Sequence, residues 1–510
     1  MSQGLSAIYI PEPDLIFGNN GEDKDPRLGL RYHGPYHYSD EEEPTPSQVK
    51  VGIVGSGITI SLTKNILRLL SAEIRSPNSN KWLHPDFPGF RLDTSIKCDF
   101  ITSQNWEGAI THHEVKKVLE VVDVNERIAA GVNLFRDKVE SLASDDPPDV
   151  IVCALPVQIE EYCGISDRTR GAKRPKFTEL ETKLAELKAQ NQTFLTQWGM
   201  DIETKVVQKN ECDLDFRNAL KGKVMKFGVP VQVLRESAAR GLLDYDQLAT
   251  KVTEEPAAFA WNLSTALYYK AKGKPWRLAK LRQDTCYVGI SFFRNLRSPI
   301  LDVQTSMAQV FTHNGEGIVL RGTDVIVDKY TKEPHMTGKQ ACELLTKALS
   351  RYREKAKREP SRVVVHKKSL FWEEERKGVE EAIGPLARDF VTIHVRAPFR
   401  ALRTGNYPVL RGTMVQLDDN QCLLYTTGYT PRIRTYPGSR VPVPLLITHY
   451  GDSQLNTVCE EIMGLTKLNW NTTAFGTYLP ITLAFAQKVG KVLSEFQDDK
   501  LLQEHYRFYM

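Results

Sequence analysis

Hydrophobic positions follow two different patterns in the two halves of the chain. Up to about residue 275, apolar runs such as KVGIV, DVIVCALP and VPVQVL alternate with stretches of helical periodicity, which is typical of a parallel sheet with helical crossovers. The second half shows three consecutive strand-like runs at 285–293, 302–311 and 317–322, then a helix, a strand, a helix and a strand. This is the order of an RNase H-like fold. We therefore predict an α/β protein in which a Rossmann-like domain precedes an RNase H-like domain.

Two polar stretches set the expected boundaries and pairings. The stretch SDEEEPTPSQ is acidic and broken by proline, so we expect an exposed connector there. It closes an N-terminal segment over 1–48, and the two domains are then expected over 49–278 and 279–510. Between the last two strands of the meander, residues 313–316 read HNGE and predict a hairpin turn.

The run VGIVGSGITI, at 51–60, places Gly55 and Gly57 between a strand and a helix. A dinucleotide-binding turn needs a third glycine where Ile60 stands and an acid at the end of the next strand. No lysine follows the glycines as a P-loop requires. The pattern favours an ordinary tight turn. The competing interpretation is a nicotinamide oxidoreductase that uses Gly55 and Gly57, which predicts dinucleotide binding by this chain alone.

Composition excludes several classes of site. The 510 residues are 41% hydrophobic and 25% charged. They contain no secretory signal pattern and no apolar run near the roughly 18 residues of a membrane span, so we expect a cytoplasmic protein that does not bind membranes. The eight cysteines form no CxxC pair, which favours reduced, buried side chains over disulfides or metal ligands. The eleven histidines form no ligand-spaced cluster, so no zinc site is expected.

Positive charge is concentrated in two acid-free runs, although the net charge is only +4. KAKGKPWRLAKLR covers 270–282, and HVRAPFRALRTGNYPVLR covers 394–411 and interleaves arginines with aromatic residues. Either run alone could be an ordinary solvated basic face. Two such runs beside predicted strands indicate a polyanionic ligand. The candidate contacts to a nucleic-acid backbone are Lys274, Arg277, Arg396, Arg400 and Arg403.

The metal-binding positions of an RNase H-like nuclease lack acids in this sequence. Such nucleases hold two magnesium ions between carboxylates at the middle of the first strand and the end of the fourth, because the hard cations need anionic oxygen ligands. Here the first place falls on Ser291 and the fourth-strand place on Lys367. A neutral hydroxyl and a cation cannot replace those ligands. Lys367 is expected to repel a metal and to attract a phosphate.

These features together resemble one family of nucleic-acid-guided proteins. The domain order, with VPVQVLRES, AWNLSTALYYKAKGKPW, CYVGISFF and LTKLNWNTTAFGTYLPITLAFAQKVGKVL, resembles the prokaryotic Argonautes, and most of all the short branch that consists of MID and PIWI domains. In that family the PIWI tetrad is Asp, Glu, Asp and then Asp or His. The resemblance places Gln487 at the last position. With Ser291, Lys367 and Gln487 in these places, it implies a catalytically inactive PIWI domain.

The same resemblance implies a MID pocket for the 5′-phosphate of a guide strand. Arg217 and Lys221 are four residues apart in a helical pattern, so both project from one face, and Gln232 follows in a strand. Lys270 closes the helix NLSTALYYK, where the family places a phosphate-binding lysine. Each also has an ordinary structural explanation: an exposed helix face, a strand residue that caps a neighbour, or a C-terminal helix cation. Arg217 departs from the tyrosine common in other Argonautes.

The chain ends in HYRFYM. In the family, the carboxylate of the last residue folds back to the guide pocket and, with the guide phosphate, holds a magnesium ion. The resemblance therefore implies that Met510 is a Mg²⁺ ligand through its terminal carboxylate. The alternative is a frayed tail, but three aromatic residues among the last five favour a buried one.

The resemblance implies a guide-directed sensor. We expect it to bind a 5′-phosphorylated guide RNA and a complementary single-stranded DNA target without cleaving it. The partner would be an APAZ-domain effector protein with a TIR, sirtuin-like or nuclease unit, in defence against plasmids or phage. The alternative is an active RNase H-like guide-dependent nuclease that recruits Asp284, Asp302 or Glu373. His449 and Asp452, in THYGDS, have no nucleophile elbow nearby and are expected in a loop that joins a strand to a helix.

Overall fold

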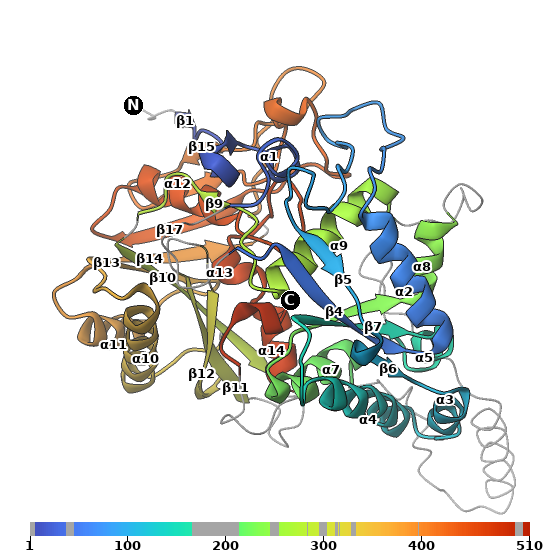
Figure 1. Ribbon diagram of the computed structural model, residues 1–510. Helices are drawn as coiled ribbons and strands as arrows, with labels where there is room; N and C mark the ends of the chain where they lie inside the picture. Colours follow the sequence, from blue (N-terminus) through green and yellow to red (C-terminus); the bar gives the residue numbers. More distant parts are fainter. Residues whose placement is uncertain are drawn as a thin grey trace, which may run out of the picture. The chain divides into compact units, whose positions relative to one another are not determined.

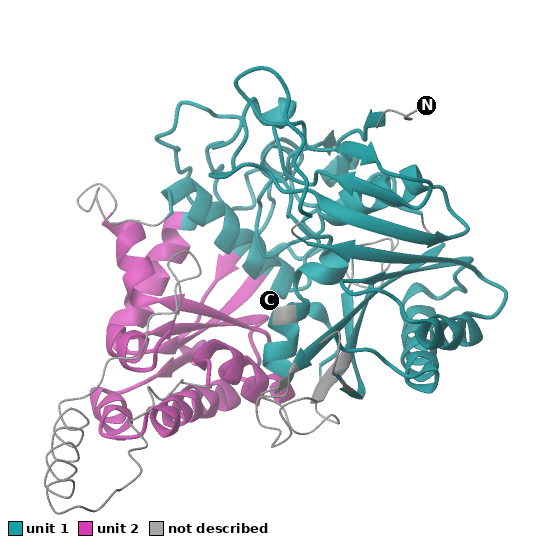
Figure 2. Ribbon diagram, turned by 180° about the vertical axis from the view of Figure 1, so that it is seen from behind, with its two compact units in different colours: residues 1–48, 70–99, 254–510 teal, residues 49–69, 100–253 magenta. Residues whose placement is uncertain are grey.

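The computed structural model describes residues 6–36, 45–165, 214–244, 254–282, 284–294, 303–311, 315, 317–327, 333–395, 397–494 and 503–510. The chain forms two compact units, both discontinuous in sequence, which Figure 2 colours separately. Unit 1 contains residues 1–48, 70–99 and 254–510, and unit 2 contains residues 49–69 and 100–253. The linear domain boundaries after residues 48 and 278 stay predictions.

Unit 2 is built on the parallel sheet predicted for the first half. Its strand order is β5-β4-β7-β8, and β4 pairs in parallel with both β6 and β7. All six residues of β7, VIVCAL, are buried, as expected for a strand with helices on both faces of its sheet. The strands are β4 Gln48–Gly55, β5 Asp99–Ile101, β6 Glu107–Ala109, β7 Val150–Leu155 and β8 Val231–Arg235. The helices are α2 Gly57–Leu70, α3 His112–Leu119, α4 Val124–Leu142, α5 Val157–Tyr162, α7 Phe216–Val224 and α8 Glu236–Leu243.

The glycine-containing run forms the tight strand-to-helix turn that the sequence predicts. β4 ends at Gly55 and α2 begins at Gly57. A Cβ on Gly55 would lie 2.6 Å from the carbonyl oxygen of Ala154 in β7, so only glycine permits this close approach. Thr59 Oγ1 donates to the same carbonyl at 3.0 Å. Gly55 thus has a packing role in the sheet.

Unit 1 contains the RNase H-like order predicted for the second half. Its nine-stranded sheet has the order β1-β15-β16-β17-β14-β13-β10-β11-β12. The meander β10–β11–β12 is antiparallel, and β10 then pairs in parallel with β13, which pairs in parallel with β14. The elements are β10 Thr285–Arg294, β11 Val303–Phe311, β12 Gly317–Ile326, α10 Gly338–Ala356, β13 Arg362–Lys367, α11 Glu373–Ile383 and β14 Ala387–His394. The predicted sequence of elements is confirmed, and Gly315, in the predicted hairpin turn, has a φ of +81°.

Helices cover both faces of this sheet. Helices α10 and α11 pack side by side (Figure 1) and share a hydrophobic core with alternate residues of β10, such as Val288 and Ile290. Gly289, between them, faces the opposite way and lies against Thr482 of α13. The remaining elements are α9 Pro256–Lys270, β15 Thr413–Gln416, β16 Gln421–Leu424, β17 Leu445–Gly451, α12 Leu455–Leu465, α13 Ile481–Ala484, α14 Ala486–Ser494 and the 3-10 helix η6 Tyr506–Phe508.

The N-terminal segment belongs to the same unit as the C-terminal half. Strand β1, Ser6–Tyr9, is an edge strand of the nine-stranded sheet and pairs with β15. Strand β2, Leu15–Ile16, pairs with β3, Glu22–Asp23, and with β9, Arg277–Leu278. Helix α1, Pro26–His33, follows, capped by the Asp25 carboxylate. Residues 6–36 are thus structurally part of the RNase H-like unit.

Candidate nucleic-acid interface

Ser291 is the residue predicted at the first-strand metal position of an RNase H-like nuclease. It lies in β10 and shares a face with Gly289, because side chains alternate along a strand. Ser291 is 9% exposed, and its Oγ has no hydrogen-bond partner among the described residues. A hydroxyl at this place cannot supply the anionic oxygen that Mg²⁺ requires.

Lys367 lies on the opposite face of the sheet from Ser291. It pairs with Ile290 in the parallel register of β10 and β13, so its side chain points toward α11 with that of Ile290. Its Nζ donates to both carboxylate oxygens of Glu375, at 2.7 and 2.6 Å, and to the Leu370 carbonyl at 3.1 Å. Burial lowers the pKa of Lys367 despite the opposing charge of Glu375. The expectation that Lys367 attracts a phosphate is therefore wrong, since its charge is neutralised inside the protein.

The neighbouring residue, Lys368, was not selected by the sequence analysis. It is the first residue after β13, and the same alternation places it on the face of Ser291. It is exposed on the surface, although partial desolvation lowers its pKa, and no carboxylate pairs with it among the described residues. The alternation of side chains along β13 could have identified Lys368. Val363 and Val365 face the apolar core, so Lys367 faces the core with them and Lys368 faces the other side.

The remaining candidate acids are not brought together with these positions. Asp284 precedes β10 and accepts a hydrogen bond from Ser361, at the end of the sheet opposite to Lys368. Glu373 begins α11 and forms an exposed i,i+4 ion pair with Lys377 at 2.7 Å. Asp302 lies outside the described residues, and so does the side chain of Gln487 in α14. Across the described ranges, three or more histidine, cysteine, aspartate or glutamate side chains never group as a metal site would require.

Three of the predicted guide-binding residues lie on adjacent elements of unit 2. Arg217 and Lys221 are half-buried on α7, whose first turn is capped by the Asp215 carboxylate. Helix α7 packs against β8, where Gln232 is half-buried and its amide donates to the Val233 carbonyl at 3.3 Å. The predicted helix and strand are confirmed; the role of these residues in guide binding stays a prediction.

The fourth predicted residue, Lys270, and the chain terminus lie in unit 1. Lys270 is the last residue of α9 and is buried. Helix α9 contacts η6, and Met510 is only 5% exposed. The expectation of a buried rather than frayed tail is confirmed. Whether the Met510 carboxylate binds a metal stays a prediction.

A basic cavity lies between the end of α9 and the C-terminal tail. Its lining is Tyr269, Lys272, Lys274, Gly317, Trp470, His505 and Arg507, and it encloses about 30 Å³. The lining contains no acid, and the Trp470 indole N–H has no acceptor among the described residues. A phosphate oxygen would satisfy this donor beside the cations.

The loop that leads into this cavity is held in an unusual conformation. Lys272 has a φ of +70°, and its N–H donates to Tyr269 O while Gly273 N–H donates to Tyr268 O. This pair of hydrogen bonds closes α9 in a motif that normally places glycine where Lys272 stands. A lysine there costs about 1 kcal/mol, and such strain is typical of functional positions. Lys274 lines the cavity, whereas Arg277 stacks on Tyr36 at 4.8 Å.

The second basic run forms the loop after β14. The Arg400 guanidinium donates to the carbonyls of its own loop, Ala397 and Phe399. Arg403 lies over the Tyr429 ring, 5.4 Å from its centre. Neither arginine pairs with a carboxylate anywhere in the described part of the chain, so both charges are available to a polyanion. Arg396 lies outside the described residues.

Comparison with known proteins rests on structure, because no family model and no curated protein matches the chain. The solved structure of Clostridium butyricum Argonaute bound to a guide DNA and a 19-mer target DNA matches with a TM-score of 0.60 and 14% identity, covering 97% of this chain and 53% of that chain. Drosophila Piwi matches with a TM-score of 0.59 and 13% identity, and the match covers 99% of this chain and 56% of the Piwi chain. Aquifex aeolicus Argonaute matches with a TM-score of 0.53 and 13% identity, and the match covers 99% of this chain and 57% of the Argonaute chain.

The chain has an Argonaute-like fold. Its α/β architecture is that of a Rossmann-like MID domain, represented by the parallel sheet of unit 2, followed by an RNase H-like PIWI domain, represented by the nine-stranded sheet. The predicted fold class is confirmed. The chain spans about half the length of the Argonaute and Piwi structures that it matches.

A buried polar network lies at the other end of the PIWI sheet from Lys368. His449 is in β17, not in the expected loop, and its Nε2 bonds Asp389 at 2.7 Å. Two further groups donate to the same carboxylate: Arg362 Nε at 2.6 Å and Ser453 Oγ at 2.8 Å. Because Ser453 and His449 both bind Asp389 rather than each other, the serine has no base and the cluster is not a nucleophilic triad.

This network makes stability depend on pH. Burial alone would raise the pKa of Asp389, but the His449 hydrogen bond and the Arg362 charge outweigh burial and lower it from 3.8 to about 2. A carboxylate with a lowered pKa contributes stability above its ordinary pKa and loses it as the pH falls toward the folded value. The contribution here is roughly 2 kcal/mol. We expect the stability difference between wild type and Asp389→Asn, measured by urea unfolding, to shrink by this amount between pH 5 and pH 2. A constant difference would contradict this.

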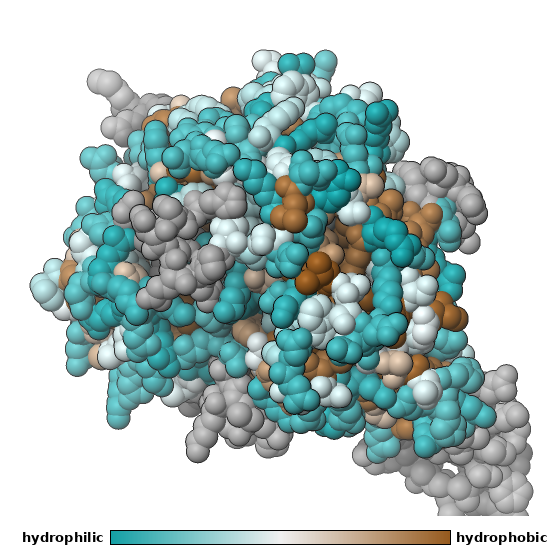
Figure 3. All heavy atoms as spheres, in the orientation of Figure 1, coloured by the Kyte–Doolittle hydropathy of each residue, from teal (hydrophilic) through white to brown (hydrophobic). Residues whose placement is uncertain are grey.

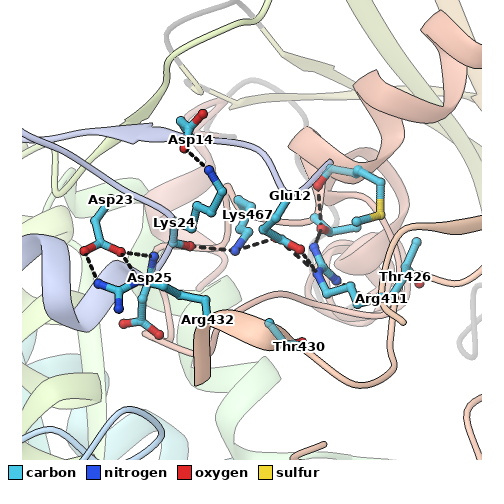
Figure 4. Close-up of polar contacts among 12 residues, drawn as sticks. Glu12, Asp14, Asp23, Lys24, Asp25, Arg411, Thr426, Thr430, Arg432 and Lys467 are labelled. Carbon is cyan, nitrogen blue, oxygen red and sulfur yellow. Dashed lines mark hydrogen bonds and ion pairs between the residues drawn. The ribbon is translucent and has the colours of Figure 1, made fainter. Parts of the chain in front are cut away.

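The N-terminal segment is fastened to the PIWI domain by buried ion pairs (Figure 4). Arg411 Nε donates to Glu12 at 2.8 Å, and Lys467 Nζ lies 2.7 Å from the same carboxylate. Burial lowers the pKa of Lys467 to about 8, despite the opposing charge of Glu12. Two half-buried pairs, Lys24–Asp14 and Arg432–Asp23, lie nearby. Arg411, at the end of the second basic run, therefore has a structural role.

Two further expectations from composition have an outcome. Seven of the eight cysteines are described; all are free thiols, and all but the half-buried Cys342 are buried. The Sγ atoms of Cys422 and Cys459 are hydrogen-bonded at 3.4 Å and form no disulfide. Among the helices of the described ranges, none combines the length and the apolar character that crossing a membrane requires.

Proposed function

We propose that this chain is a guide-directed nucleic-acid sensor with an inactive PIWI domain. It binds a 5′-phosphorylated guide RNA and a complementary single-stranded DNA target in the cytoplasm, and it leaves the target intact. Base pairing with the guide supplies the sequence selectivity, and the protein holds the strands by their backbones. Target binding activates an associated APAZ-domain effector protein, of the TIR, sirtuin-like or nuclease kind, in prokaryotic defence against plasmids or phage.

One observation carries the proposal. On an Argonaute-like fold, Ser291 within β10 and Lys368 just after β13 share one face of the sheet, and we propose that this is the face on which a nuclease would need carboxylates for its metal ions. A hydroxyl and an ammonium group hold a phosphate but not Mg²⁺. This supports duplex binding without hydrolysis, with catalysis in the partner chain.

In this proposal the guide end is bound by the residues that the resemblance to Argonautes implies. Arg217, Lys221 and Gln232 supply cationic and amide donors from the MID domain, and Lys270 supplies a further cation. A carboxylate such as that of Met510 is an oxygen ligand of the kind Mg²⁺ takes. Bound between this carboxylate and the guide phosphate, Mg²⁺ would offset their repulsion.

The pocket predicts selectivity for the 5′-phosphate. Each charge-assisted hydrogen bond to a phosphate contributes roughly 1.5–3 kcal/mol, so Lys221→Ala is expected to weaken binding of a 5′-phosphorylated RNA about 10- to 100-fold, measured by fluorescence anisotropy. Binding of the same RNA with a 5′-hydroxyl should not change. Lys223→Ala is the matched control, because Lys223 is exposed on the same helix two positions away. Equal losses for both RNAs would show a general charge effect and contradict the pocket.

The deciding experiment is to purify the chain with the proteins encoded beside it and to sequence the bound nucleic acid. A pool of uniform short strands with 5′-phosphates supports the sensor. The guide-loaded protein is then incubated with labelled target and Mn²⁺. Intact target supports the proposal; guide-dependent cleavage that is lost on replacing a single acid overturns it in favour of the nuclease.

A further inference from the structure

The loop after β14 exposes hydrophobic side chains that the protein itself does not cover. Leu402 is 85% exposed and Phe399 is 61% exposed. On the face drawn in Figure 3, hydrophilic residues predominate and hydrophobic residues are interspersed among them. A single exposed leucine needs no explanation, but neighbouring exposed aromatic and aliphatic residues on one loop indicate a contact surface.

The loop is held in place while these side chains project. The Arg400 guanidinium bonds the backbone carbonyls on either side of Pro398, those of Ala397 and Phe399. The Ala401 N–H donates to the Tyr425 hydroxyl at 2.6 Å, which ties the loop to the sheet just beyond β16. Because these hydrogen bonds already order the loop, little conformational entropy is lost when the loop binds a ligand.

The far end of the loop is ordered by aromatic stacking. Tyr407 stacks on Tyr429 with ring centres 4.5 Å apart, and Arg403 covers the same Tyr429 ring. The two ends of the loop are therefore fixed, and the exposed side chains of Phe399 and Leu402 lie between them in the sequence.

The charges around the loop identify the class of ligand. β13 and β14 are parallel, so the segments that follow them leave the sheet at the same end. These two segments contain three cations, Lys368, Arg400 and Arg403. None of the three pairs with a carboxylate among the residues described. Cations interleaved with exposed aromatic and aliphatic groups are the combination that binds single-stranded nucleic acid, by backbone charge and base stacking together.

We infer that Phe399 and Leu402 contact unpaired nucleobases of the strand bound at this end of the PIWI sheet. Bases within a duplex are already stacked on each other, so only an unpaired base can offer its face to Phe399. The cations hold the backbone of the same strand. This surface thus engages the single-stranded part of the target where pairing with the guide ends. The inference rests on the proposed function and adds a base contact to it.

The test compares two strands of equal charge with the guide-loaded protein. A fluorescein-labelled target has several unpaired thymidines beyond its guide-complementary region, and a second target carries abasic sites at those positions. Wild type is expected to bind the first target roughly 10-fold more tightly. The double variant Phe399→Ala/Leu402→Ala is expected to bind both targets alike, with an unchanged salt dependence.

Two variants serve as matched controls. Val441→Ala removes another exposed aliphatic side chain of the same unit, 60% exposed, and should keep the preference for bases over abasic sites. Lys368→Ala should keep that preference but reduce the slope of log affinity against log salt by about one. Thermal unfolding verifies that each variant is folded.

The outcomes separate this inference from the proposed function. If wild type binds guide and target but does not distinguish the two targets, the base contact is overturned and the sensor stands. If the double variant keeps the distinction, the inference is also overturned. If the double variant instead loses only its co-purifying effector, the loop is a protein interface and the base contact is wrong. Absence of guide binding by wild type would overturn the proposed function itself.

Discussion

Replacing Glu375 by alanine is expected to lower the free energy of unfolding by about 3–5 kcal/mol. Glu375 is 1% exposed, and its carboxylate accepts two hydrogen bonds from Lys367 and one each from the backbone N–H groups of Met336 and Trp372. Its removal leaves the buried Lys367 ammonium with only the Leu370 carbonyl as acceptor. The side chain must then be desolvated as a cation or lose its proton, and either is costly. Urea unfolding measures the effect.

Two further variants separate the buried ion pair from the helix. Glu374→Ala changes the exposed neighbour in the first turn of α11 and should cost no more than about 1 kcal/mol. The double variant Lys367→Met/Glu375→Leu should recover part of the lost stability, because it removes the unpaired buried charge but leaves the N–H groups of Met336 and Trp372 without the Glu375 acceptor. If Glu375→Ala cost as little as Glu374→Ala, the buried pair would be contradicted.

Glu12→Gln is expected to release the N-terminal segment from the PIWI domain. Arg411 and Lys467 are both buried, and Glu12 is the carboxylate that balances them. The amide keeps the shape of the side chain but leaves two buried cations without an anion, so we expect a loss of about 3–5 kcal/mol. The loss should be smaller above pH 8, because Lys467 titrates near that value and can become neutral. Urea unfolding at pH 7 and pH 9 measures this.

Limited proteolysis gives a local measurement of the same change. The segment over 6–36 should be cleaved faster in Glu12→Gln than in wild type, because local opening is governed by the contacts that hold the segment. Asp14→Asn is the matched control: the Asp14–Lys24 pair is far more accessible to solvent than the Glu12 pairs, so its loss should cost only about 1 kcal/mol. Equal rates of cleavage of the segment in both variants would contradict the role of the buried Glu12 ion pairs in holding it.

The sequence predicted the parts of the fold that depend on local periodicity. The strand order from β10 to β14, the tight turn at Gly55 and the buried C-terminal tail all follow from apolar spacing and turn residues that lie close together in the chain. The apolar runs of the meander also predicted the first and last residues of β10, β11 and β12 to within a few positions.

The parts that depend on distant pairing were not predictable from this sequence. SAIY in β1 is a four-residue strand with every side chain exposed, so it has no buried alternation to mark it. The partner of Lys367 lies eight residues away on a helix, and nothing in KKSLFWEEE distinguishes Glu375 from its two neighbours before the helix is placed against the sheet. The prediction that Lys367 attracts a phosphate was wrong because the core of the whole sheet decides which strand residues face inward, and Lys367 shares the buried face with Val363 and Val365.

The pairing of β1 with β15 has a consequence for how the protein is made. Ser6 pairs with Gln416, which emerges from the ribosome 410 residues later. At roughly 5–20 residues per second, the amino-terminal strand waits about 20–80 s before its partner exists. During that interval the amino-terminal strand has no partner to pair with, whereas the strands β10 to β14 are all synthesised before β15. The edge that β1 forms is therefore added to the sheet late, after the central strands are available to fold.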